Sequence, residues 1–409
     1  MGLNIDKIRE DFPILGRKIH GKRLIYFDNA ATSLKPIQVI NSIISYYKEH
    51  CAKVHRGIHT LSQEASDMYE RAREEVAKMI NAKTNEIIFT LNATDSINLV
   101  AQSWALDNLK EGDIIVTTVM EHHSNMLPWR IVANRVKVEV KYIDITDEGI
   151  LKCEELEKLV DENVKLIAIT HVSNVLGTIN DIMRVIKVAH NVGSLVLVDG
   201  AQSVPHMPLD VKELDIDFLA FSGHKMLGPT GIGVLYAKEE ILEEMKPSRV
   251  GGGTIKEVTL SDVKYEEVPL KFEAGTPNIA GAIGLAEAVR YLRRIGMENV
   301  FKHELDLVSY TFKLIDEELK DSIEVYGPKN PNKRCGIVTF NIKDLNPDVV
   351  AALLDARGIA VRSGKHCAHP LYQRLRINGA VRASYYIYNT RDEVEYFIEV
   401  LKEIVKSKF

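Results

Sequence analysis

Strand-length runs of apolar residues alternate with amphipathic stretches over the first two-thirds of the chain. The apolar runs end in small or polar residues, and the stretches between them carry apolar residues at helical spacing. Because strands that alternate with helices form a parallel sheet with helices on both faces, the pattern predicts an α/β domain. The expected strands are 86–90, 114–119, 137–143, 166–171, 194–199 and 218–221, and an adjacent one, antiparallel as one option, at 232–237.

The order of predicted helices and strands changes at about Gly296. Helical patterns there alternate with short strands, and a terminal helix closes the chain, which is typical of a small α+β domain. The segment 251–271, just before this change, reads as a long flexible loop. The expected small-domain strands are 323–326, 336–341, 359–361 and 381–387. The expected parts of the chain are an N-terminal segment, 1–22, that packs with the small domain, a large domain, 23–295, and the small domain, 296–409.

The composition argues against a nucleic-acid-binding, a disulfide-rich and a membrane-spanning protein. The 409 residues are 45% hydrophobic, enough for a large core, and the formal charge of −5 gives no sign of nucleic-acid binding. Four scattered cysteines without a Cys-x-x-Cys pair do not form a disulfide framework. The first ten residues mix charges of both signs, and no uncharged apolar run approaches the roughly 18 residues of a membrane span. We therefore expect a cytoplasmic protein that binds neither nucleic acid nor membrane.

Two charged residues follow buried strands. Lys225 comes after 218–221, and Asp199 ends 194–199. Ligands bind at the carboxyl edge of parallel strands, and a partly desolvated lysine there has a lowered pKa and can form a Schiff base. An aspartate that pairs with a pyridinium nitrogen completes the arrangement that pyridoxal phosphate requires. Taken alone, Lys225 is equally read as a solvated surface lysine.

Further polar residues fall at the same predicted edge. Thr94 and Ser96 lie in a turn between a strand and a helix, so they suit a phosphate group or serve as helix caps. His123 follows the strand 114–119, where its ring can lie on a pyridine face or be structural. His55 and His59 are four residues apart, but no carboxylate or cysteine completes a metal site, so none is expected.

A second reactive centre falls in the small domain. Cys367 is followed and preceded by basic residues and lies between Gly364 and Pro370, in a loop able to move. A positive surrounding favours the thiolate, whereas zinc ligation by the nearby histidines lacks a fourth ligand. Arg382 alternates with apolar residues on a strand and is read either as a clamp for a substrate carboxylate or as a rim salt bridge. The basic neighbours of the cysteine are Arg362, Lys365, His366 and His369.

Seven ordered motifs carry a resemblance. They are FDNAAT at 27–32, VHRGIH at 54–59, EHHSN at 121–125, DGAQS at 199–203, SGHK at 222–225, GTPN at 275–278 and R-x-G-x-H-C-A at 362–368. From about Leu24 to Arg391 the chain resembles the SUF-type cysteine desulfurases, which are group II, NifS-related class V aminotransferases. The resemblance implies a fold-type I pyridoxal-phosphate-dependent α/β transferase fold, a homodimer, and a mainly parallel seven-stranded sheet with a smaller C-terminal domain.

The resemblance also implies a role for each matching residue. Lys225 would carry the Schiff base, Asp199 would pair with the pyridinium nitrogen, and Cys367 would accept sulfur. The remaining roles are His123 stacked on the ring, Gln202 on the ring oxygen, Thr94, Ser222 and His224 on the phosphate together with the partner subunit's Thr276, and Asn174, Arg362 and Arg382 at the substrate.

The implied reaction converts L-cysteine to L-alanine and leaves a persulfide for iron–sulfur cluster assembly, with a SufE-like or SufU-like protein or a cluster scaffold as acceptor. A selenocysteine lyase and a non-catalytic pyridoxal-phosphate-binding sulfur-carrier scaffold are the alternatives. Two departures from the family stand out. Lys365 replaces a usual histidine, and Leu91-Asn92-Ala93 replaces a usual Arg-Gly-Thr in the phosphate turn.

Overall fold

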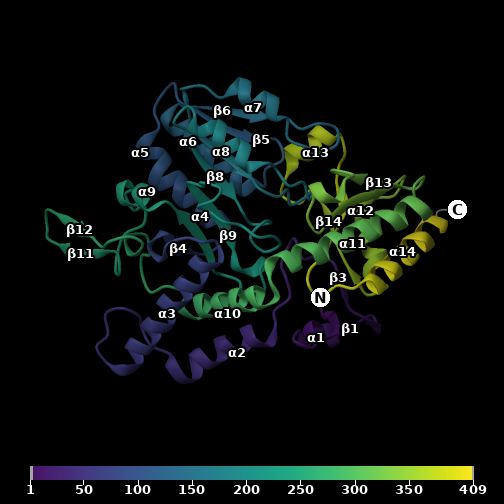
Figure 1. Cartoon of the computed structure of the whole chain (residues 1–409), viewed down its shortest axis with the longest axis horizontal. Helices are drawn as coiled ribbons and strands as arrows, with labels where there is room; N and C mark the ends of the chain where they lie inside the picture. Colours follow the sequence, from purple (N-terminus) through teal and green to yellow (C-terminus); the bar gives the residue numbers. More distant parts are fainter. Residues whose placement is uncertain (1–2, 408–409) are drawn as a thin grey trace.

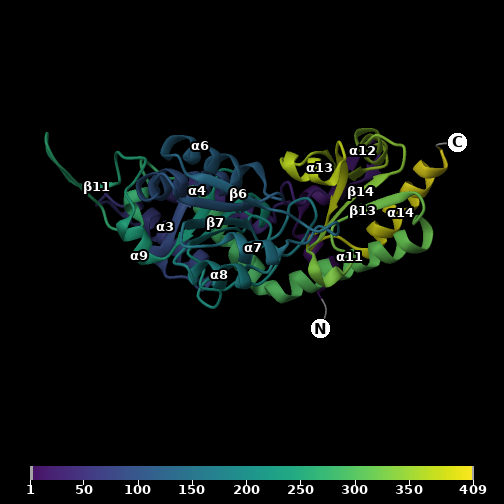
Figure 2. The ribbon, with the colours of Figure 1, turned by 90° about the horizontal axis from the view of Figure 1, so that it is seen from above.

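Two β-sheets, each with helices packed on it, lie toward opposite ends of the elongated molecule in the computed structural model, which describes residues 3–407 (Figures 1 and 2). The larger sheet has seven strands in the order β4-β10-β9-β8-β7-β5-β6. All neighbours pair in parallel except β10, which is antiparallel to β4 and β9. The predicted sheet is thus confirmed. Its strands are β4 (Ile87–Thr90), β5 (Ile114–Thr118), β6 (Glu139–Ile143), β7 (Val164–Thr170), β8 (Leu195–Asp199), β9 (Phe218–Ser222) and β10 (Gly233–Ala237).

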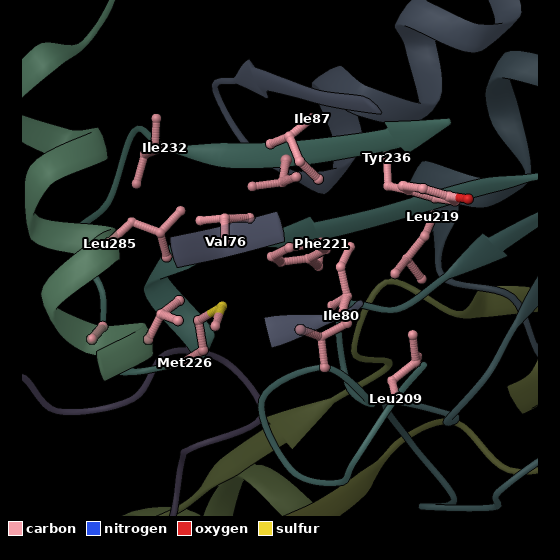
Figure 3. Packing of buried hydrophobic residues seen from close by; sticks show 14 of the residues in the cluster. Val76, Ile80, Ile87, Leu209, Leu219, Phe221, Met226, Ile232, Tyr236 and Leu285 are labelled. Atoms are coloured by element: carbon pink, nitrogen blue, oxygen red, sulfur yellow. The ribbon is translucent and has the colours of Figure 1, made fainter. Parts of the chain in front are cut away.

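Both faces of this sheet are buried, which explains the continuous apolar runs in its strands. In β9, Leu219 and Phe221 face the core formed with α3 (Thr60–Met79) and α10 (Ile279–Ile295), as Figure 3 shows. Phe218 and Ala220 face the opposite core. The other helices of this part are α2 (Ile37–Ser45), α4 (Ala93–Val100), α5 (Leu106–Asn108), α6 (Leu127–Val136), α7 (Cys153–Leu159), α8 (Ile182–His190) and α9 (Glu239–Glu244).

Two helix starts are fixed by side-chain caps. The cap of α3 is His59, whose Nδ1 accepts the backbone N–H of Ser62 at 3.3 Å. Helix α4 begins at Ala93, because the side chain of Asn92 accepts the N–H of Asp95 at 3.0 Å. The second cap matters for the site, since it brings the helix N-terminus up to the carboxyl edge of the sheet.

The smaller sheet is antiparallel, with the order β13-β14-β17-β16. Helices α11 (Met297–Glu318), α12 (Pro347–Asp355) and α14 (Arg391–Lys406) pack on it. One prediction is wrong here: β15 (Ile359–Ala360) leaves this sheet and pairs in parallel with β3 (Ile25–Tyr26). Strand β16, just before the cysteine loop, was not predicted. The four strands are β13 (Ile323–Tyr326), β14 (Ile337–Ile342), β16 (Arg362–Gly364) and β17 (Ala380–Ser384).

The N-terminal segment touches both halves of the molecule. Helix α1 (Ile5–Glu10) forms an ion pair between Arg9 and Glu393 of α14 at 2.8 Å. Just after α1, Asp11 accepts the hydroxyl of Tyr291 in α10 at 2.7 Å. The segment therefore ties the start of the chain to both sheets. The short hairpin β1 (Lys18–Ile19) and β2 (Lys22–Arg23) follows it.

The segment expected as a flexible loop at 251–271 contains an antiparallel hairpin instead. Strands β11 (Ile255–Val258) and β12 (Val263–Tyr265) pair with each other and project from the body of the molecule (Figure 1). Most of their residues are exposed, so they lack the apolar run by which buried strands are recognised. Between residues 3 and 407, no helix is both long and apolar enough to cross a membrane.

Candidate active site

A cavity of about 400 Å³ lies where the carboxyl edge of the large sheet faces the small sheet. Its walls come from the ends of β7, β8 and β9, from the start of α4, and from β16, β17 and the loop that follows β16. It contains every predicted site residue except His123 and Thr276. Those it brings together are Thr94, Asn174, Asp199, Gln202, Ser222, His224, Lys225, Arg362, Cys367 and Arg382.

Lys225 lies in the 3-10 turn Gly223–Lys225 that follows β9. Burial lowers the pKa of its ammonium group from the ordinary 10.5 to about 8, and the nearby carboxylate of Asp199 opposes that shift. Within residues 3–407 no carboxylate forms an ion pair with its Nζ. At pH 7 an amine with this pKa is neutral, and so nucleophilic, in about one molecule in ten, against fewer than about one in a thousand for an ordinary lysine.

Asp199 and Gln202 form the wall beside that amine. Asp199 ends β8 and accepts the N–H of Ala201 at 3.0 Å, while burial raises the pKa of its carboxyl. The amide nitrogen of Gln202 donates to the carbonyl of Ala30 at 2.7 Å. Its Oε1 is buried and has no hydrogen-bond partner among residues 3–407. The wall therefore offers a carboxylate and an unused amide oxygen to a polar ring.

One end of the cavity is suited to an anion. The N-terminus of α4 points here, and Ser222 Oγ holds it by accepting the N–H of Ala93 at 2.9 Å. Gly233 of β10 packs so tightly beneath this turn that an added Cβ would lie 2.4 Å from the Cα of Asn92. The Thr94 hydroxyl is within 2.6 Å of the Ser124 hydroxyl, on the cavity wall. Helix N-termini with hydroxyl groups bind phosphate well.

The opposite end carries two arginines. Arg382 of β17 is only 2% exposed and donates to the carbonyl of Asn174 at 2.8 Å. Its other terminal nitrogen is 3.4 Å from Asp28, while its Nε has no partner. Arg362 is exposed and lies 4.0 Å from the same aspartate. A buried guanidinium with an unused donor can bind a substrate carboxylate.

Cys367 lines the cavity from the loop that follows β16 of the small sheet. It is exposed, has φ 56°, and follows His366 with φ 46°, so two consecutive residues adopt the left-handed conformation. The loop runs from β16 to α13 (His369–Leu375). The amine of Lys225 and this thiol, from different sheets, thus face one cavity.

The structure places one predicted histidine outside the cavity. His122, not His123, lines the cavity, and burial and the charge of Lys225 lower its pKa to about 3. The side chain of His122 caps the 3-10 turn His123–Asn125 by accepting the N–H of Ser124. His123 instead contacts His369, with 2.9 Å between Nε2 and Nδ1. Because the two histidines are adjacent, the sequence pattern alone does not indicate which of them lines the cavity.

Two further predictions concern residues outside the cavity. Thr276 lies on the exposed surface just before α10. His55 is held by Glu70 at 2.8 Å. In the described part of the chain, no three His, Cys, Asp or Glu side chains are arranged to hold a metal ion.

Comparisons with known proteins agree with this geometry. Residues 25–397 match the model of the class V aminotransferase family. The chain is 50% identical to a probable cysteine desulfurase of Halalkalibacterium halodurans, over 96% of each chain. The apo structure of a cysteine desulfurase from Thermococcus onnurineus NA1 superposes with a TM-score of 0.95 at 46% identity, over 100% of this chain and 99% of the other. The cysteine desulfurase CsdA of Escherichia coli, in its S-sulfonic acid form, gives 0.91 at 35% identity, over 99% of both. The chain therefore belongs to the class V aminotransferase family and, within it, to the cysteine desulfurases.

Proposed function

We propose that this protein is a pyridoxal-phosphate-dependent enzyme that converts L-cysteine to L-alanine and retains the sulfur as a persulfide on Cys367. The observation that carries the proposal is that Cys367 and Lys225 line the same cavity although they belong to different sheets. A site that only bound an amino acid would need neither a reactive amine nor an accessible thiol.

The residues of the cavity fit pyridoxal phosphate. The N-terminus of α4 with Thr94, Ser222 and His224 would hold its phosphate, and Lys225 would form the Schiff base. Asp199 would pair with the pyridinium nitrogen, the unpartnered Oε1 of Gln202 would accept a hydrogen bond from the ring hydroxyl, and His122 would lie against the ring face. When bound, the cofactor supplies an electron sink for the carbon next to the amino group.

Side chains of the protein bind the substrate, move the proton and accept the sulfur. Arg382, with Arg362 and Asn174, binds the substrate carboxylate and turns the substrate thiol toward Cys367. Lys225, once displaced by the substrate amine, takes the proton from Cα. The Cys367 thiolate then attacks the substrate sulfur, so that an S–S bond forms and the S–Cβ bond breaks. The electron pair of the broken bond stays on the amino acid, which takes up protons to become alanine.

We further propose a homodimer in which the partner subunit's Thr276 reaches the phosphate. Its support is that Thr276 is exposed and outside the cavity of its own chain, and that apolar side chains of the α2 region are exposed. These side chains are Ile40, Ile44 and Tyr47. The persulfide would pass to a SufE-like or SufU-like protein or to a scaffold for iron–sulfur clusters, because Cys367 is exposed at the mouth of the cavity. The division at residues 22 and 295 into a terminal segment, a large domain and a small domain is part of the same proposal.

The test measures alanine and protein-bound persulfide after addition of L-cysteine to the wild-type protein and to Cys367→Ala. We expect persulfide at Cys367 by mass spectrometry and its loss, with that of most turnover, in the variant. Unchanged turnover in the variant would refute the role of the thiol. Selenocysteine turned over in preference to cysteine would indicate a lyase, and a cofactor absorbance band lost in Lys225→Ala but without product in the wild type would indicate a non-catalytic carrier.

A further inference from the structure

The cysteine loop is fastened to the large sheet at successive residues. The side chain of Asn174 donates to the carbonyl of His366 at 2.8 Å, and the backbone N–H of His123 donates to the carbonyl of Cys367 at 2.8 Å. Two residues further on, the backbone N–H of His369 donates to Nε2 of His123 at 3.2 Å. The reactive cysteine is thus held on both sides by groups that follow β5 and β7.

These contacts hold a backbone that would otherwise relax. His366 and Cys367 have φ 46° and 56°, a region that residues with a Cβ rarely adopt, least of all twice in succession. Such a conformation persists only where surrounding contacts impose it. The carbonyls of both residues accept hydrogen bonds from segments that follow strands of the large sheet. We infer that these hydrogen bonds stabilise the strained backbone.

The contact between the two histidines has a defined direction. Their rings are stacked at 4.7 Å between centroids with 15° between planes, and Nδ1 of His369 is 2.9 Å from Nε2 of His123. A backbone N–H can only donate, so Nε2 of His123 is the acceptor and its proton is on Nδ1. The single lone pair of this nitrogen is then shared by two donors of His369, the backbone N–H and the N–H at Nδ1. Burial and the neighbouring His369 lower the pKa of His123, in agreement with a neutral ring.

We propose that His123 and His369 are positioning residues that form a latch, joining the large sheet to the cysteine loop and holding the Cys367 sulfur over the substrate. Neither side chain lines the cavity, so the pair acts on the reaction only through the position of the thiol. The inference rests on the proposed function for its effect on catalysis, but the latch itself is a property of the resting protein.

The latch predicts two separable effects when it is broken. Cys367, which is exposed but held at the cavity in the wild type, reacts faster with small alkylating reagents, because its loop leaves that fixed position. Persulfide formation becomes slower, while binding of cysteine is almost unchanged, because Lys225 and Arg382 are untouched. A displacement of a reacting atom by about 1 Å costs up to about 100-fold in rate, so we expect kcat to fall about 10–100-fold with KM within about twofold.

The experiment compares His123→Leu and His369→Leu with the conservative His123→Gln and His369→Asn in the cofactor-loaded protein. Gln can place an acceptor near the position of Nε2, and Asn can place a donor near that of Nδ1. Iodoacetamide labelling of Cys367 is followed by peptide mass spectrometry, with the exposed Cys51 as the internal reference. We expect labelling relative to Cys51 to rise about tenfold in the leucine variants and to stay near the wild-type value in the conservative ones. The double leucine variant should add little, because the two residues act as one unit.

A matched control is His20→Leu, which removes an exposed histidine paired with the exposed Asp355; this histidine does not line the cavity, and its loss should change nothing. Equal labelling and equal kcat in wild type and both leucine variants would overturn the latch, and so would equal defects in the leucine and conservative variants. If His123→Leu fails to fold, His369→Leu breaks the same contact from the exposed side. A wild-type protein without desulfurase activity would remove the proposed function, whereas the labelling ratios would still test the latch.

Discussion

The lowered pKa of Lys225 can be tested by titrating its reaction with pyridoxal phosphate. Burial brings the pKa from the ordinary 10.5 to about 8. A group whose pKa is 2.5 units lower is neutral about 150 times more often at pH 8, since about half of it is deprotonated there instead of about 0.3%. We expect the rate of Schiff-base formation in the cofactor-free protein to rise about tenfold between pH 7 and pH 9 and to level off above that.

The assay follows the absorbance of the bound cofactor after stopped-flow mixing from pH 6.5 to pH 10. A model amine, Nα-acetyl-lysine amide, is measured in parallel, because the cofactor's own titrations affect both reactions equally. An ordinary lysine would give a rate that climbs tenfold per pH unit through pH 9 without levelling off. That result would refute the effect of burial.

A matched variant tests the direction of the electrostatic effect. The carboxylate of Asp199 favours the ammonium form of Lys225, so Asp199→Asn should move the midpoint to lower pH. A midpoint that moves to higher pH would contradict the charge arrangement of the cavity.

Three further predictions concern stability and binding. Glu273→Ala leaves the 1%-exposed side chain of Arg73 without its buried carboxylate and should lower the free energy of unfolding by about 3–5 kcal/mol in urea; a loss under about 1 kcal/mol would contradict a buried ion pair. Arg382→Lys loses the planar fork and should lower kcat/KM for cysteine at least about tenfold, chiefly through KM in steady-state assays. Gly233→Ala places a Cβ against the backbone at the cap of α4 and should weaken cofactor binding by about 1–3 kcal/mol in equilibrium dialysis, whereas Gly16→Ala, with nothing within 4 Å, should not.

The candidate site shows which functional residues can be predicted from patterns in the sequence and which cannot. Apolar runs followed by Asp199 and Lys225 located two reactive groups at one sheet edge, because period and burial are local properties of strands. The adjacent His122 and His123 could not be separated in this way. Which ring enters the cavity depends on the turn after β5 and on the contact with His369, a residue of the other sheet.

The amino-acid sequence by itself determined the alternation of strands and helices and the parallel sheet, and it named Lys225 and Cys367 as candidate reactive groups, but it left the direction of β10 open. These follow from local spacing of apolar residues and from residue type. Only the tertiary structure decided that β15 pairs with β3, that 255–265 forms a hairpin, and that the thiol reaches the cavity of the amine. The first and the last depend on contacts between segments far apart in the chain, which no local pattern of residues predicts. The hairpin is local, but its exposed strands lack the apolar run by which buried strands are recognised.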